Sequence, residues 1–170
     1  MPCDGVPRCY EPLTDEHLHH LVTLAVPIFE TLFDNRPDGS GRYRGRLLML
    51  ALCQGAALHR VNGQHGVKDL DVWGFFHTHP DGEFPPRWHQ SCDFGPSSLG
   101  FSPHDPGYTG RRVDVLGRSI GVRDEEDALA AVRRYLGSHA TETADLLAQR
   151  PVIALHPAPL FGVEVWPVGL

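Results

Sequence analysis

The sequence contains no apolar run close to the roughly 20 residues that a membrane-spanning helix requires. Its first residues, MPCDGVPRCYEPLTDEH, also lack the basic segment followed by an apolar segment that marks a secretory leader. We therefore expect a cytoplasmic protein that has no membrane partner.

The chain also lacks an excess of positive charge, since its 170 residues have a formal net charge of −6. This balance argues against a broad surface for nucleic acids, which bind chiefly through contacts between cations and phosphates. Cysteine is scarce, and Cys3, Cys9, Cys53 and Cys92 are too scattered for a zinc ribbon. Because disulfides are rare in the cytoplasm, we predict four free thiols.

The hydrophobic pattern predicts one α+β domain over residues 1–170, in which residues 1–13 form an irregular arm. A helix is expected from Thr14 to Leu32, and Pro27 is expected to kink it or split it in two. Residues 77–110 are rich in proline and glycine and are predicted to form one long loop. Strands are expected at 46–53, 67–76, 111–120, 152–156 and 162–168. Three more helices are expected at 56–61, 124–137 and 141–150.

Three aspartates are the strongest candidates for a metal site. Asp69 and Asp71 lie two residues apart in VKDLDVW, so on a strand both side chains point to the same face. Carboxylate oxygens are ligands that Mg²⁺ prefers. Asp114 interrupts the apolar segment RVDVL, where an acid is costly to bury without a partner. Gly55, between a predicted strand and a predicted helix, would let a phosphate approach the backbone.

The segments LCQGAALH, VKDLDVW and RVDVL, in this order, resemble the signature of the DNA polymerase β-like nucleotidyltransferase superfamily. The resemblance covers roughly residues 47–118. It implies a mixed β-sheet flanked by helices, two Mg²⁺ ions, and transfer of a nucleoside monophosphate from a triphosphate to an acceptor hydroxyl with release of pyrophosphate. It further implies that Asp69 and Asp71 hold the metals, and that Asp114 binds the second metal and assists deprotonation of the acceptor.

The same resemblance implies that Gly55 and Ala56 contact the triphosphate, although the family usually has glycine or serine where this chain has Ala56. Positive charge for the triphosphate is expected from Lys68, Arg112 and Arg118. Arg112 shares a strand face with Asp114, so the two could also form an ion pair. The acceptor could be a small molecule, a protein side chain or an RNA end, and the 77–110 loop is expected to contact it.

Two other interpretations remain open from the sequence. GFFHTHPDGEFPP resembles the start of the motif of JAMM zinc metallopeptidases, in which His77, His79 and Asp93 would hold Zn²⁺. The later positions, Ser91 and Asp93, do not keep that family's spacing. The second alternative is a catalytically inactive module that binds a nucleotide without turning it over.

Overall fold

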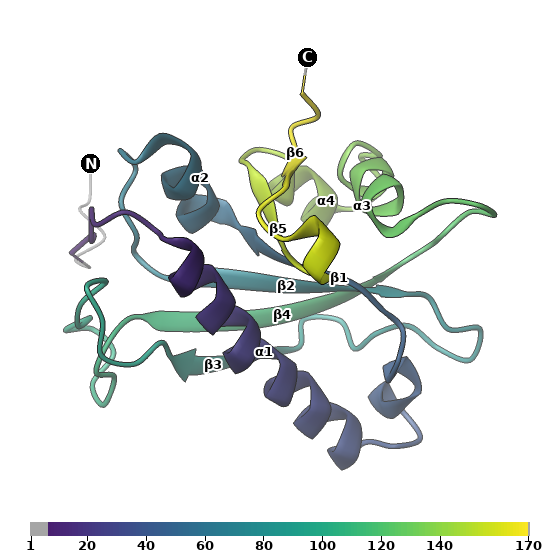
Figure 1. The fold of residues 1–170 in the computed structure, drawn as a ribbon. Helices are drawn as coiled ribbons and strands as arrows, with labels where there is room; N and C mark the ends of the chain where they lie inside the picture. Colours follow the sequence, from purple (N-terminus) through teal and green to yellow (C-terminus); the bar gives the residue numbers. More distant parts are fainter. Residues whose placement is uncertain (1–6, 170) are drawn as a thin grey trace.

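The computed structural model describes residues 7–169, and its named strands form one six-stranded sheet in the order β3-β4-β2-β1-β5-β6 (Figure 1). Strands β2 and β4 are parallel, and the other neighbouring pairs are antiparallel. This mixed sheet with its helices confirms the predicted α+β class. The strands are β1 Leu47–Cys53, β2 Leu70–His77, β3 His89–Asp93, β4 Arg112–Ile120, β5 Val152–His156 and β6 Glu164–Trp166.

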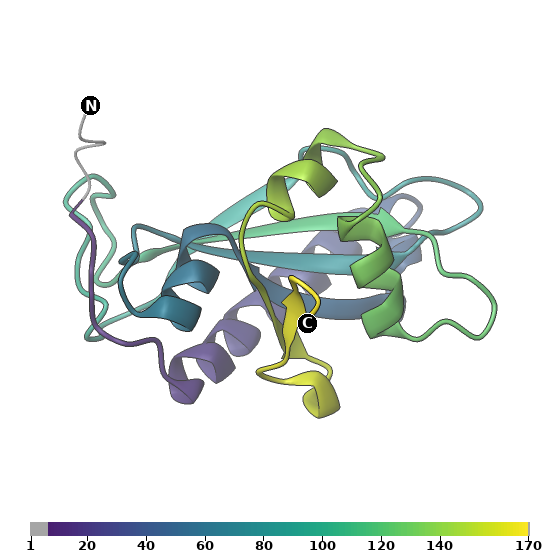
Figure 2. The same ribbon diagram turned by 90° about the horizontal axis from the view of Figure 1, so that it is seen from above.

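The helices pack on both faces of this sheet (Figure 2). One buried cluster joins the longest helix to β1, β2 and β4, and a second cluster joins the two helices before β5 to the opposite face. Among the described residues, no helix is both long enough and apolar enough to cross a membrane. The α-helices are α1 Asp15–Asn35, α2 Gln54–Asn62, α3 Ala128–Leu136 and α4 Glu142–Leu147, with 3₁₀ turns η1 at Ser40–Tyr43 and η2 at Ala158–Leu160.

Helix α1 begins where the sequence predicted, because the Thr14 side chain accepts a hydrogen bond from the His17 amide. Of the two predicted effects of Pro27, a kink or a split, the split does not occur, since α1 continues through this residue to Asn35. Pro27 and Thr23 both lie on the exposed face of the helix. The Thr23 carbonyl, which loses its usual helical partner, can therefore bond to water instead.

Two glycines allow α1 to approach the sheet closely. Gly74 of β2 and Gly117 of β4 are partners in the parallel register. A Cβ added to Gly74 would lie 2.6 Å from Cζ of Phe29 in α1, and a Cβ on Gly117 would overlap the ring of Phe84. The pair therefore forms a shallow depression in the sheet that two aromatic rings fill.

The clearest error of the sequence analysis is the single loop over 77–110, because this segment contains strand β3. β3 has the polar sequence HQSCD and forms an edge of the sheet, so it lacks the apolar alternation that marks a strand. Its pairing with β4, and not its own composition, stabilises it.

Several element boundaries also differ from the predictions. Strand β2 begins at Leu70 and not at residue 67, so Asp69 lies just before the strand. Helix α3 begins at Ala128 because Asp127 caps it, accepting a hydrogen bond from the Ala130 amide. Helix α2 starts at Gln54, two residues earlier than predicted, while α4 is shorter than predicted at both ends.

The predicted N-terminal arm is irregular over its described part but is fixed to the domain. Cys9 and Val67 exchange two backbone hydrogen bonds, and the imidazole Nε2 of His59 lies 2.9 Å from the Glu11 carbonyl oxygen. Cys9, Cys53 and Cys92 form no disulfide in this part of the chain. The fourth predicted thiol, Cys3, lies outside the described residues.

Candidate functional site

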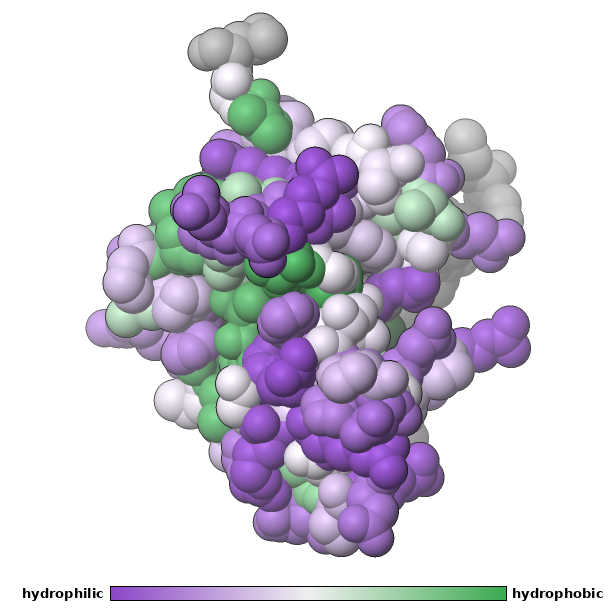
Figure 3. Space-filling model, turned by 90° about the vertical axis from the view of Figure 1, so that its right-hand side faces the viewer, coloured by the Kyte–Doolittle hydropathy of each residue, from purple (hydrophilic) through white to green (hydrophobic). Residues whose placement is uncertain are grey.

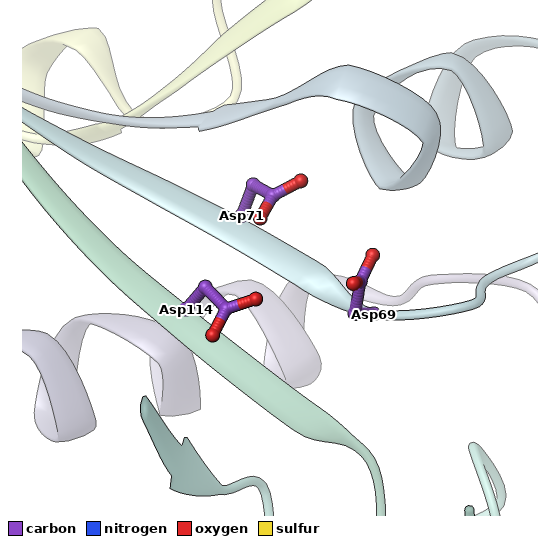
Figure 4. A group of neighbouring side chains, drawn as sticks. All are labelled: Asp69, Asp71 and Asp114. Carbon is purple, nitrogen blue, oxygen red and sulfur yellow. The ribbon is translucent and has the colours of Figure 1, made fainter. Parts of the chain in front are cut away.

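The three predicted aspartates converge on one side of β2 and β4 (Figure 4). Asp71 stands opposite Asp114 in the parallel register, and Asp69 comes two residues before Asp71. One carboxylate oxygen of each lies within 4.8 Å of the other two. No other group of three histidine, cysteine or acidic side chains within residues 7–169 is arranged to hold a metal in this way.

The electrostatics of this group favour a cation. Burial, and then the negative charges of Asp69 and Asp114, raise the pKa of Asp71 from 3.8 to about 7. Burial and Asp114 also raise the pKa of Asp69. Three like charges at this separation repel one another, and a divalent cation between them would remove that repulsion.

Two neighbours fix the third carboxylate. Asp114 Oδ1 accepts a 2.5 Å hydrogen bond from the Ser91 hydroxyl and a 2.9 Å bond from Nε of Arg112. Neither bond uses Oδ2. Ser91 stands opposite Asp114 on β3, and the sequence analysis missed this role because it did not identify β3 as a strand. The Arg112 pairing was one of its two alternatives and is confirmed.

A pocket of about 290 Å³ adjoins the aspartates at the start of α2. Of the predicted phosphate-contacting residues, Gly55 and Lys68 line it, together with Asp69 and Asp71. The side chain of Ala56 does not, because it is buried in the core. A Cβ on Gly55 would lie 3.0 Å from Nε2 of His65, so a larger residue here would crowd the side chain of His65.

Three basic residues that the sequence analysis did not select line the same pocket. They are Arg8 from the N-terminal arm, His65 from the turn before β2, and Arg150 from the segment before β5. Burial, and then the charges of Arg150 and Arg8, lower the pKa of His65. The pocket is thus lined by two arginines and Lys68 as well as by the acids Asp69 and Asp71.

Arg112 and Arg118, the other two predicted phosphate ligands, do not line this pocket; Arg112 is paired with Asp114, and Arg118 lies elsewhere. It is four residues beyond Asp114 on β4, about 13 Å along the strand, and its Nη1 donates a 3.0 Å hydrogen bond to the Thr143 hydroxyl. It lines a second pocket of about 460 Å³ that also contains Trp73 and Leu116. The structure therefore does not bring Arg118 together with the aspartates.

The proposed zinc ligands are also separated. Asp93 pairs with Arg112 at one end of β4, whereas His77 pairs with Ile120 at the other end. Eight residues of strand span about 26 Å, so Asp93 and His77 cannot bind one ion. The Asp93 carboxylate instead accepts hydrogen bonds from the amides of Gly95, Thr109 and Gly110 within its own loop. This ligand set for zinc is therefore wrong.

The site combines a cluster of acids with a pocket at the start of a helix, and this pocket is lined by basic residues as well as by two of the acids. Such a combination can hold a divalent cation beside a chain of phosphates. Comparison with protein-family models, curated proteins and solved structures found no match to this chain. Function is therefore inferred from the chemistry of the site itself.

Proposed function

We propose that this chain is a metal-dependent nucleotidyltransferase of the DNA polymerase β-like kind. It would move a nucleoside monophosphate from a nucleoside triphosphate to an acceptor hydroxyl and release pyrophosphate. The observation that supports this most strongly is the convergence of Asp69, Asp71 and Asp114 beside a polar pocket at the start of α2.

The donor set fits magnesium. The aspartates offer hard oxygen ligands from two adjacent strands, and the raised pKa of Asp71 reflects a concentration of negative charge that a divalent ion would relieve. Asp69 and Asp71 would bind two Mg²⁺ ions, and Asp114 would bind the second of these ions. When bound, the metal neutralises phosphate charge and increases the acidity of the acceptor hydroxyl.

The chain itself supplies the phosphate-binding wall. The first amides of α2 have no side-chain cap from Cys53, so they are available to donate to an anion. Gly55 has no Cβ and lets the phosphates approach these amides. Lys68, which precedes the first aspartate, also lines the pocket and adds positive charge there.

Asp114 is the proposed group that takes up the proton of the acceptor hydroxyl. The hydrogen bonds from Ser91 and Arg112 both end on Oδ1 and fix the orientation of the carboxylate. Oδ2 is then the oxygen directed to the reaction. Positioning of this kind is a large part of catalysis in nucleotidyl transfer, because reaction requires the attacking and leaving oxygens to be aligned.

The second pocket, of about 460 Å³, is the proposed site for the acceptor. Trp73 lies two residues after Asp71 and Leu116 two residues after Asp114, so both occupy the same sheet face as the aspartates. Residues 83–88, from the 77–110 segment that was expected to contact the acceptor, also line this pocket. At the end of the molecule where β2 and β4 finish, hydrophobic surface lies exposed between hydrophilic side chains (Figure 3).

A pocket of this size and mixed lining favours a small-molecule acceptor over an RNA end or a protein side chain. The acidic net charge of −6 agrees with an acceptor that is not itself a polyanion. We further propose that the reaction takes place in the cytoplasm, where nucleoside triphosphates are present.

The test combines binding with turnover. Wild-type protein is expected to bind a nonhydrolysable triphosphate in a Mg²⁺-dependent manner, and to release pyrophosphate from triphosphates when a panel of hydroxyl compounds is supplied. Asp69→Asn combined with Asp71→Asn is expected to abolish both. Asp81→Asn, which changes an exposed acid outside the pocket, serves as the matched control.

Equal Mg²⁺-dependent nucleotide binding in the wild type and in the double variant would overturn the assignment. Mg²⁺-dependent binding that depends on the aspartates, but never yields pyrophosphate with any acceptor, would instead identify the inactive nucleotide-binding module.

A further inference from the structure

Two arginines converge on one uncharged nitrogen in the pocket beside the aspartates. Nη1 of Arg8 lies 3.2 Å from Nε2 of His65, and Nη1 of Arg150 lies 3.4 Å from the same atom. An arginine can only donate, so Nε2 must be the acceptor and the imidazole must be neutral. A single ring nitrogen has one lone pair and cannot fully satisfy two guanidinium groups.

These two arginines differ from the four described arginines that are paired with acids. Arg44, Arg60, Arg112 and Arg134 each form an ion pair with a carboxylate. Within residues 7–169, neither Arg8 nor Arg150 does so. Two like charges are therefore held close together without a compensating acid, although the acids Asp69 and Asp71 line the same pocket.

The backbone of Arg8 is anchored to the domain, and the guanidinium group of Arg150 lies close to Gly55, although the Arg8 side chain itself is exposed. The Arg8 segment is fixed by the backbone pairing of Cys9 with Val67. It packs against the turn before β2 so closely that a Cβ on Gly66 would lie 2.9 Å from the Arg8 Cβ. On the other side, a Cβ on Gly55 would lie 3.2 Å from Nη1 of Arg150. The arginines thus flank the uncapped start of α2.

We infer that Arg8 and Arg150, spaced by His65, bind the polyphosphate tail of the nucleoside triphosphate. Guanidinium groups form strong, often bidentate hydrogen bonds to phosphate oxygens, and two of them on one wall can bind adjacent phosphates. His65 is a positioning residue, because its ring nitrogen keeps the two cations a fixed distance apart. The nucleoside contributes nothing to this contact, so inorganic tripolyphosphate and pyrophosphate bind here as well.

Identification of the anion as a nucleotide tail rests on the proposed function, whereas binding of an inorganic polyphosphate does not. The first experiment is therefore calorimetric titration of the intact protein with tripolyphosphate, without divalent metal. Wild type is expected to bind, and Arg8→Gln combined with Arg150→Gln is expected to weaken binding at least about tenfold. Arg123→Gln changes an arginine in the loop before α3 and is the matched control.

Two further double variants show whether a loss of tripolyphosphate affinity comes from the lost charges or from a change in the fold. Arg8→Lys combined with Arg150→Lys keeps both charges, so it is expected to bind tripolyphosphate more tightly than the glutamine double variant. A collapsed pocket would not regain affinity in this way. Asp69→Asn with Asp71→Asn removes nearby negative charge, so it is expected to leave tripolyphosphate binding intact or to strengthen it. Unchanged tripolyphosphate affinity in the glutamine double variant would overturn the inference.

A second titration, with nucleotides and Mg²⁺, distinguishes this inference from the proposed function. The glutamine double variant is expected to lose affinity for the triphosphate while its weaker affinity for the monophosphate stays unchanged. If tripolyphosphate binding depends on the arginines but the aspartates have no effect on Mg²⁺-dependent nucleotide binding, the anion site stands and the transferase assignment fails. If nucleotide transfer depends on the aspartates but not on the arginines, the transferase assignment stands and the anion site fails.

Discussion

Asp71 and Asp114 are direct partners in the parallel register of β2 and β4. Backbone hydrogen bonds between these adjacent strands set the separation of the two side chains, and no flexible loop intervenes. This pair of the acidic cluster is therefore fixed by the sheet and does not need a metal to assemble it, while Asp69 lies just before β2. In the metal-free protein, repulsion among the ionised carboxylates destabilises the folded state.

Metal-free protein is expected to be less stable at about pH 8 than at about pH 5 on account of Asp71. Its pKa is raised from 3.8 to about 7 on folding, so the folded state holds this proton more tightly than the unfolded state. This stabilisation is fully present below the unfolded-state pKa of 3.8 and is lost as the pH rises through the folded-state pKa of about 7. It contributes at most roughly 4 kcal/mol to the free energy of unfolding. Urea unfolding in a chelator measures it.

The comparison that isolates this effect is Asp71→Asn, which cannot ionise. At about pH 8 without metal, the variant is expected to be more stable than the wild type, and the difference is expected to vanish near about pH 4. Asp81→Asn, at an exposed site, is the control. Parallel pH profiles for wild type and Asp71→Asn would contradict the raised pKa.

Magnesium binding is expected to release a proton near neutral pH. Because Asp71 is partly protonated at about pH 7, the ion must displace that proton to bind its carboxylate. Affinity for Mg²⁺ therefore rises with pH until about pH 8. Titration calorimetry in buffers with different ionisation enthalpies measures the protons released, and Asp71→Asn is expected to release fewer.

Ser91→Ala is expected to reduce nucleotide transfer without abolishing it. The change removes the 2.5 Å hydrogen bond to Asp114 Oδ1 but leaves the Arg112 contact, so the carboxylate is less well oriented. A hydrogen bond to a charged group contributes about 1.5–3 kcal/mol, which corresponds to a loss of roughly tenfold or more in rate. Ser91→Thr keeps the hydroxyl and is expected to retain most activity.

Gly74→Ala is expected to destabilise the fold by about 1–3 kcal/mol, because the new methyl group meets the Phe29 ring at 2.6 Å. Gly121→Ala is the matched control, since a Cβ at that glycine has no neighbour within 4 Å. Chemical denaturation of both variants measures the difference. Equal stabilities would show that α1 can shift away from the sheet without cost.

His77→Ala and His79→Ala are expected to leave metal affinity unchanged, in contrast to Asp114→Asn. His77 lies at the opposite end of the β2/β4 pair from the aspartates, about 20 Å along the strand from Asp71. Equilibrium dialysis with Mn²⁺ as a Mg²⁺ substitute, and with Zn²⁺, measures the affinities. Stoichiometric Zn²⁺ that is lost in His77→Ala would revive the peptidase interpretation.

The sequence was most informative where a local pattern decides the structure. Strand β5 is a continuous apolar run and was predicted with its observed ends, 152–156. The spacing of Asp69 and Asp71 predicted that their side chains lie close together, and they do, although Asp69 lies just before the strand. The start of helix α1 was predicted correctly from its cap, but the helix runs three residues beyond the predicted end at Leu32 and is not split at the exposed Pro27.

The residues that were missed depend on contacts between distant parts of the chain. Ser91 meets Asp114 only through the pairing of β3 with β4. Arg8 and Arg150 meet at His65 from opposite ends of the sequence, and nothing local distinguishes them from ordinary surface arginines. Arg118 was placed with the phosphates because of its closeness in sequence, but four residues of extended strand carry it away from Asp114.

The course of the chain after β2 has a consequence for how such a protein could diversify. The segment at 78–88 leaves the sheet beside Ile120, lines the larger pocket, and rejoins the sheet at β3. It contributes no residue to the acidic cluster and does not set the register between β2 and β4. If the proposed transferase function holds, substitutions or length changes in this segment are expected to change the acceptor while leaving the acidic cluster intact.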